Sequence, residues 1–141
     1  MIYLRYFVYL IEHKWNVFIE CLKMGLLIHA FTHDLSKFLL EEFVPYAKYY
    51  CSNRKNTTSD YELAWHFHRS RNRHHWDYWV DINRKALPMP KKYVKQMICD
   101  WRGMARKFQD TAEEFFEKNR RKMILHESTV VIIENLLNKR G

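Results

Sequence analysis

Hydrophobic residues recur with a helical period along residues 3–24, the first segment of the chain. They return after one, three or four positions, which is typical of a helix with one apolar face. The stripe comprises Phe7, Leu10, Ile11, Trp15, Phe18 and Leu22. Arg5, Glu12, His13 and Lys14 interrupt the apolar run well before the ~18 residues that a membrane span needs. We therefore expect a buried first helix that ends at about Met24, and no membrane segment.

The helical period returns in the rest of the chain, between two polar loops. The predicted helical segments are residues 26–34, 36–51, 61–76, 91–108, 111–122 and 128–140, and the loops are 52–60 and 83–90. Pro45 is expected to kink or restart its helix, and Pro90 to begin the helix at 91. Ser59 or Asp60 is expected to cap the helix at 61. With only 3 Gly and 3 Pro, the chain is predicted to be a single all-α domain, 1–141, a compact bundle of about six helices.

The net charge and the cysteine content limit the kinds of partner and the cellular compartment that we expect. The net charge is +8 with neutral histidines, which favours an anionic partner such as nucleic acid, nucleotide phosphates or an anionic membrane surface. A basic surface that contacts only solvent would give the same net charge. Cys21, Cys51 and Cys99 are odd in number and form no C-x-x-C pair, so we expect reduced thiols in a cytoplasmic protein.

Five of the eight histidines fall in two polar segments, HDLSK and HFHRSRNRHH. Clustered imidazoles with carboxylates are the ligands of divalent transition metals. In the second segment, a continuous helix would place His68 and His75 on one face, two turns apart, and would point His66 elsewhere. His74 reaches that face only if the end of the helix unwinds. The segment therefore offers up to three metal ligands.

Two further histidines stand alone on apolar segments. His29 and His126 are interpreted as core residues, with His29 kept as a minor candidate for the site.

The HDLSK segment has two interpretations. His33 and Asp34 would diverge from a regular helix, but at a helix junction both side chains can turn towards one ion. Lys37 lies one turn from Asp34 and can pair with it or reach a bound anion. Alternatively, Asp34, or Ser36 with Glu41 or Glu42, caps a helix.

HDLSK resembles the H-D-x-x-K signature of the HD-domain metal-dependent phosphohydrolases, an all-α superfamily. The resemblance implies an upstream histidine and a downstream aspartate, for which the chain offers His13 and Asp100. The implied first ion is held by His13, His33, Asp34 and Asp100, and Asp34 would bridge to a second ion held by His68, His74 and His75. No G-Y-P element follows the double histidine, where WDYW stands instead, so cyclic-dinucleotide hydrolysis is not expected.

The chain also resembles a family of small bacterial and phage proteins that share a domain of unknown function. The segments that carry this resemblance are HKWNVF, HDLSKF, EEFVPYAKYY, AWHFHRSRNRHHWDYW and MPKKYVKQMICDW. They cover the chain from about Glu12 to its C-terminus, in an order and spacing that chance rarely produces.

The combined expectation is a phosphohydrolase that acts on a nucleotide or a related small phosphoester. Asp34 and Lys37 are the predicted catalytic residues, and Arg69, Asn72 and Arg73 are predicted to bind the substrate. The cofactor is one or two ions of Mn, Fe, Co, Ni or Zn, since mixed His and carboxylate ligands suit all five. Nucleic acid and a second copy of the chain stay open as partners.

Two other function classes stay open. The chain could be a helical module that uses its +8 charge and its Arg-rich helix on nucleic acid. It could instead be an inactive HD relative in which the metal serves stability alone. The five tryptophans are interpreted as core residues, in preference to a base-stacking platform.

Overall fold

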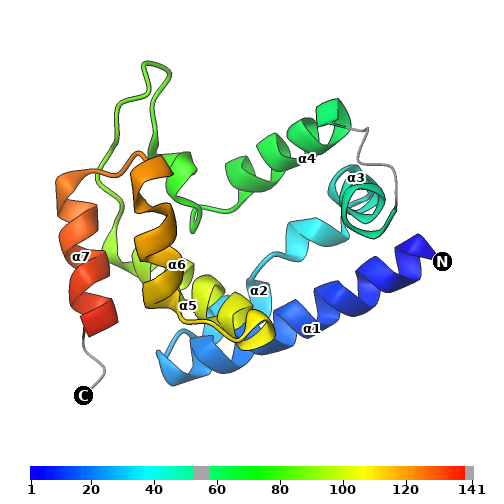
Figure 1. Ribbon diagram of the computed structural model, residues 1–141, viewed down its shortest axis with the longest axis horizontal. Helices are drawn as coiled ribbons and strands as arrows, with labels where there is room; N and C mark the ends of the chain where they lie inside the picture. Colours follow the sequence, from blue (N-terminus) through cyan, green and yellow to red (C-terminus); the bar gives the residue numbers. More distant parts are fainter. Residues whose placement is uncertain (53–57, 139–141) are drawn as a thin grey trace.

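The computed structural model describes residues 1–52 and 58–138 and is all-α in those ranges (Figure 1). Its α-helices are α1 Ile2–Lys23, α2 Leu27–Thr32, α3 Leu40–Cys51, α4 Thr58–Arg71, α5 Lys91–Phe108, α6 Ala112–Asn119 and α7 Glu127–Asn138. Its short 3₁₀ helices are η1 Leu35–Phe38, η2 Trp76–Trp79 and η3 Arg120–Lys122. The predicted fold class is confirmed, with seven α-helices in the described residues where about six were predicted. No helix among these residues is long and apolar enough to cross a membrane.

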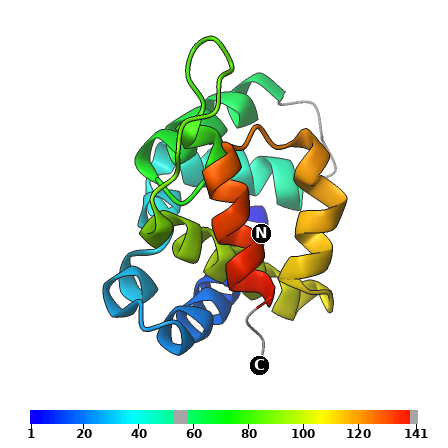
Figure 2. The same cartoon turned by 90° about the vertical axis from the view of Figure 1, so that its left-hand side faces the viewer.

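The helices enclose apolar clusters on either side of a polar centre. One cluster joins α5, α6 and α7 around Ile98, Trp101 and Phe116. Another joins α1, α3 and α4 around Tyr6, Tyr46 and Ala64. α1 packs along α5, α3 and α2 (Figures 1 and 2). The polar centre lies where the middle of α1, the α2–η1 junction, the end of α4 and the middle of α5 meet.

The close packing of α1 against α5 depends on Gly103. A Cβ at this position would lie 3.0 Å from the backbone nitrogen and 3.1 Å from the Cα of Val17, and closer still to the Val17 side chain. Val17 is fully buried, so neither helix can move aside without opening the interface.

Gly103→Ala is expected to destabilise the protein by about 1–3 kcal/mol, because overpacking outweighs the gain in helix propensity. Chemical denaturation measures this difference. Adding Val17→Ala should recover part of the loss, since it removes the methyl groups that the new Cβ meets. A variant with Gly103→Ala alone that is more stable than wild type would contradict the close contact.

The apolar stripe predicted for the first helix is wrong in part. Leu10 is buried and Phe18 is partly buried, whereas Phe7, Ile11, Trp15 and Leu22 are exposed. The buried residues of α1 are Tyr6, Leu10, His13, Val17, Glu20 and Cys21. This face includes His13, which packs on the polar centre, and Glu20, which pairs with Arg106 of α5. A prediction based on apolar residues alone cannot select such a face.

Several predicted element boundaries also change. The helix predicted for 36–51 is broken at Leu39, whose extended backbone separates η1 from α3, and Pro45 lies inside α3 without ending it. The helix predicted for 61–76 begins at Thr58 and ends at Arg71, so Ser59 and Asp60 lie within it and do not precede it. Residues 53–57, most of the first predicted loop, lie outside the described ranges.

Candidate metal centre

The α2–η1 junction turns two adjacent side chains in the same direction. His33 ends α2 with an extended backbone, and Asp34 follows in the left-handed region, with φ of 54°. Such a conformation is uncommon for a non-glycine residue, though aspartate tolerates it better than most. Lys14 donates hydrogen bonds from Nζ to the carbonyl oxygens of Phe31 and His33, which fixes this junction against α1. Because the helix is broken here, the side chains of His33 and Asp34 point in the same direction, whereas on a regular helix they would point apart.

The helix-cap alternative for this segment is wrong. Asp34 precedes η1 but makes no capping hydrogen bond with its side chain. The Ser36 hydroxyl donates to the carboxylate of Glu42 at 2.9 Å and does not cap a helix. Both polar side chains therefore face the centre of the molecule.

Four side chains from three parts of the chain form a first group of donors. His13 Nε2 of α1 lies 3.3 Å from His33 Nε2, 3.5 Å from Asp34 Oδ2 and 3.2 Å from Asp100 Oδ1 of α5. His33 Nε2 lies 3.3 Å from Asp34 Oδ2 and 3.5 Å from Asp100 Oδ1. These are the four residues that the HD resemblance assigned to one ion.

A second group shares Asp34 with the first. Asp34 Oδ1 lies 3.4 Å from His68 Nε2 and 3.3 Å from His74 Nε2. His68 Nε2 also lies 2.9 Å from His75 Nε2. His74 and His75 follow the end of α4, so this end does unwind, and His75 reaches His68 from the loop and not from a shared helix face. The Asn72 side chain donates to the carbonyl oxygen of His68 at 2.7 Å and stabilises this helix end.

The spacing of the donors fits coordination of an ion by each group. Ligands about 2.1 Å from a common ion lie about 3.0 Å apart at octahedral edges and about 3.4 Å apart at tetrahedral edges. Asp34 is 1% exposed and His74 is 2% exposed. Asp34 Oδ1 and His74 Nε2 are buried and lack a hydrogen-bond partner among the described residues. Buried polar atoms without partners are costly, and a cation between them would satisfy both.

Outer residues orient the donors, and of these the sequence predicted only His29, as a minor candidate for the site. Glu42 of α3 is fully buried and its Oε2 lies 2.9 Å from His68 Nδ1, so it holds the ring with Nε2 towards the centre. Arg71 binds the other oxygen of Glu42 at 3.0 Å. His29 Nε2 lies 3.2 Å from His33 Nδ1 and does the same for His33. The sequence offers no separate signal for Glu42, which is one of two acidic residues in the first turn of α3.

Glu42→Gln is expected to weaken metal binding by about tenfold, because the carboxylate that orients His68 and raises its basicity becomes neutral. Glu41→Gln is the matched control: Glu41 is exposed and also pairs with Arg71, but it does not contact a histidine of the centre in the structure. Calorimetric titration with Mn²⁺ compares the two variants. Equal affinities would show that Glu42 does not position a ligand.

Charge is balanced inside the centre. Burial lowers the pKa of His33, but the carboxylates of Asp34 and Asp100 outweigh this effect and raise the pKa to about 9. Burial raises the pKa of Asp34, but His33, Lys37 and His68 hold it well below its usual value. Burial lowers the pKa of His75 well below normal, so this imidazole is neutral. Lys37 Nζ lies 2.6 Å from Asp34 Oδ2 and is the ammonium group of the centre.

Metal affinity is expected to rise with pH between about 6.5 and 9, because an ion must displace the proton that His33 retains up to a pKa of about 9. Each proton that the ion displaces makes the metal affinity change by about tenfold per pH unit. In metal-free protein the imidazolium stabilises the fold below about pH 6.5, and this contribution is lost as the pH rises through 9. Titration calorimetry across this range should therefore report proton release. Affinity that does not change with pH would contradict the assignment.

Of the predicted substrate-binding residues, Arg69 and Arg73 lie at the rim, whereas Asn72 lies against the outer side of the centre, with Nδ2 3.3 Å from His68 Nδ1. Arg69 reaches Asp77 at 3.9 Å, and Arg73 reaches the hydroxyl of Tyr93 at 3.5 Å on the surface. Asn72 donates to Ser36 and to the backbone of α4. None of the three is among the described residues that line the two cavities bordered by Asp100.

The two remaining histidines lie away from the centre. His66 is exposed, as its spacing predicted. His126 is partly buried and pairs with Ser128, so its interpretation as a core residue is wrong.

Comparison with known proteins supports one of the two resemblances. The model of a family of unknown function, DUF5662, matches residues 3–139. This agrees with the resemblance to a family of unknown function and gives no support to the HD-domain superfamily. No curated protein and no solved structure matches the chain.

Proposed function

We propose that the chain, which belongs to this family of unknown function, is a metal-dependent phosphohydrolase that acts on a nucleotide or related small phosphoester. One observation carries the proposal: two groups of buried donors share the two oxygens of Asp34, with Oδ2 facing His13 and His33, and Oδ1 facing His68 and His74. A purely structural site needs one closed set of ligands. Two sets joined by a carboxylate are the arrangement of two-metal phosphoester hydrolysis.

The residues beside the donors suit a phosphoryl group. A cavity of about 150 Å³ is lined by His13, Asp100, Lys37 and Tyr46 among others. Tyr46 is 2% exposed, and its hydroxyl has no hydrogen-bond partner among the described residues. Burial raises the pKa of Tyr46, so its hydroxyl remains a donor. Lys37 and Tyr46 thus provide a charge and a free O–H group for phosphoryl oxygens.

The chain's own residues have distinct roles in this reaction. Divalent ions at such a centre lower the pKa of water and neutralise phosphoryl oxygens when they are bound. Lys37 stabilises negative charge that develops on the transferred phosphoryl group. Tyr46 orients that group by donating to one of its oxygens. The buried histidines and Asp34 keep the reacting atoms in a cavity where few competing water molecules enter.

Metal analysis and a substrate panel test the proposal together. Protein reconstituted with Mn²⁺, Fe²⁺, Co²⁺, Ni²⁺ or Zn²⁺ is expected to retain up to two ions per chain and to release phosphate from phosphomonoesters. Tyr46→Phe should retain the ions but lower kcat/KM by about tenfold, since it removes a donor to the phosphoryl group. Retention of metal with no release of phosphate from any substrate would favour a structural metal and overturn the hydrolase proposal.

A further inference from the structure

A second, larger cavity opens from the same donors. It has a volume of about 600 Å³, within the usual range for small-molecule sites. Asp100 and His75 of the centre form part of its wall. It shares Tyr50, Trp65, Asp100 and Met104 with the small cavity that contains Lys37. A ligand whose phosphoryl group occupies the small cavity would therefore extend its organic part into the large one.

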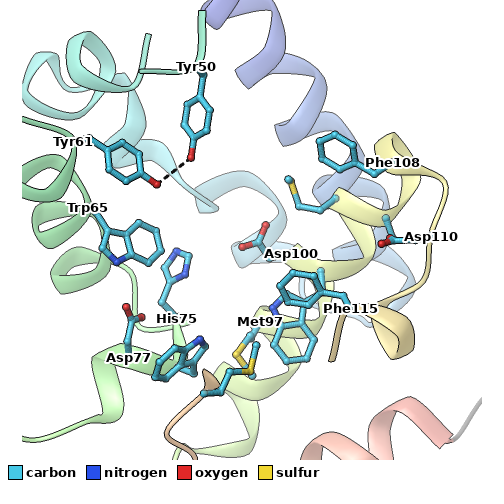
Figure 3. A pocket seen from close by; sticks show the side chains of 15 residues that line it. Tyr50, Tyr61, Trp65, His75, Asp77, Met97, Asp100, Phe108, Asp110 and Phe115 are labelled. Atoms are coloured by element: carbon cyan, nitrogen blue, oxygen red, sulfur yellow. Dashed lines mark hydrogen bonds between the residues drawn. The ribbon is translucent and has the colours of Figure 1, made fainter. Parts of the chain in front are cut away.

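The large cavity is lined mainly by apolar and aromatic side chains from α3, α4, α5 and the segments around them, and about half of the lining residues are aromatic (Figure 3). The aromatic residues are Tyr50, Tyr61, Trp65, Trp76, Trp101, Phe108 and Phe115. Tyr50 and Tyr61 join their hydroxyl groups at 3.2 Å across one end. Trp65 and Phe108 lie on opposite sides of the space in front of Asp100 (Figure 3). Such walls favour a planar ring, which can stack on an aromatic face.

The charged residues of this cavity are all acidic. Asp77, Asp100 and Asp110 line it, and its described lining residues include neither Lys nor Arg. The Oδ1 atom of Asp77 is buried and has no hydrogen-bond partner among the described residues. It can accept a hydrogen bond from a ligand. Additional phosphate groups would meet carboxylates here, and no cation of the cavity wall would neutralise them.

We infer that the large cavity binds the organic part of a phosphomonoester that bears a flat heteroaromatic ring with N–H donors, as a nucleobase does, and that the site disfavours polyphosphates. This inference rests on the proposed function for the position of the phosphoryl group. The ring stacks between the aromatic side chains, an N–H group of the ring donates to Asp77, and a single phosphoryl group lies beside Lys37. Apart from Lys37, the described residues that line the two cavities include no lysine or arginine.

Equilibrium binding tests the inference without requiring turnover. Three non-hydrolysable phosphonates are titrated into the Mn²⁺-loaded protein: analogues of adenosine 5′-monophosphate, ribose 5-phosphate and adenosine 5′-triphosphate. The monophosphate analogue is expected to bind at least about tenfold more tightly than the ribose analogue, as one stacked base contributes. It should also bind more tightly than the triphosphate analogue. Equal binding of the base-bearing and base-free compounds would overturn the inference.

A matched pair of variants locates the ring. Phe108 and Phe31 are both exposed, 60% and 66%, but only Phe108 of the two lines the cavity. Phe108→Ala is expected to weaken binding of the monophosphate analogue by about tenfold and to leave the ribose analogue unchanged. Phe31→Ala should change neither. If both variants bind like wild type, the ring does not lie in this cavity.

The same compounds in hydrolysable form separate this inference from the proposed function. Hydrolysis of adenosine 5′-monophosphate and ribose 5-phosphate with equal kcat/KM would leave the hydrolase intact and overturn the ring site. Selective binding of the base-bearing phosphonate without hydrolysis of any ester would overturn the hydrolase and support the ring site.

Discussion

Asp34→Asn is expected to remove most of the bound metal and to lower hydrolysis by at least about 100-fold. The two oxygens of Asp34 lie 3.3–3.5 Å from four histidines, two in each donor group, whereas Asp100 reaches the second group only at His74, at 3.7 Å. An amide keeps the shape of the side chain but removes the charge and one acceptor. Elemental analysis and phosphate release measure the two effects.

Asp60→Asn provides the control, because Asp60 is an exposed residue in the first turn of α4 and the same chemical change there leaves the centre untouched. Circular dichroism checks that both variants fold, since an amide in place of the Asp34 carboxylate leaves the ammonium group of Lys37 without its charged partner. An Asp34→Asn protein that keeps its full metal content would rule out the shared carboxylate.

Removal of the metal is expected to lower Tm by about 10–15 °C. An ion present at about 1,000 times its Kd adds about 4 kcal/mol to the free energy of unfolding. For a domain of this size, Tm shifts by a few degrees per kcal/mol. Without an ion, Asp34 Oδ1 and His74 Nε2 stay buried without hydrogen-bond partners among the described residues. Differential scanning calorimetry before and after chelation measures the shift.

Reconstitution identifies the kind of ion involved. Mn²⁺ or Zn²⁺ should restore Tm, whereas Ca²⁺ should not, because histidine-rich donor sets disfavour a hard cation that prefers oxygen ligands. The Asp34→Asn variant should show no chelator-dependent shift. An unchanged Tm on chelation of wild type would contradict a metal held by these buried donors.

Residue types and spacing predicted the helical class and the members of the candidate centre. A low content of Gly and Pro, with a helical period, was enough for the fold class. His13, His33, Asp34, His68, His74, His75 and Asp100 are polar residues in largely apolar or clustered settings, and all seven lie together in the structure. Spacing along a helix did not predict how they meet, because two helices end where the centre forms.

The outer residues and the cavities were beyond prediction from a single sequence. Glu42 resembles any acidic residue in the first turn of a helix, and only its burial against His68 reveals its part in the centre. The Arg-rich segment resembled a phosphate-binding face, but Arg69 and Arg73 point to the rim, where solvent and nearby side chains satisfy them. The tryptophans are all interpreted as core residues from the sequence, but their burial differs: Trp101 is buried, whereas Trp15 is 61% exposed.

The sequence by itself determined an all-α chain with two clusters of histidine and carboxylate side chains, the residue types that can ligate a metal, because helical period and residue type are local properties of the chain. Only the tertiary structure decided that HDLSK is a junction and not a cap. The left-handed backbone at Asp34 and the end of α4 at Arg71 bring donors from four distant segments together, with 3.2 Å between His13 and Asp100 and 3.3 Å between Asp34 and His74. The close packing of α1 on α5 at Gly103 and Val17 holds the helix that carries His13 against the helix that carries Asp100. Long-range packing of this kind cannot be read from the sequence neighbours of any one residue.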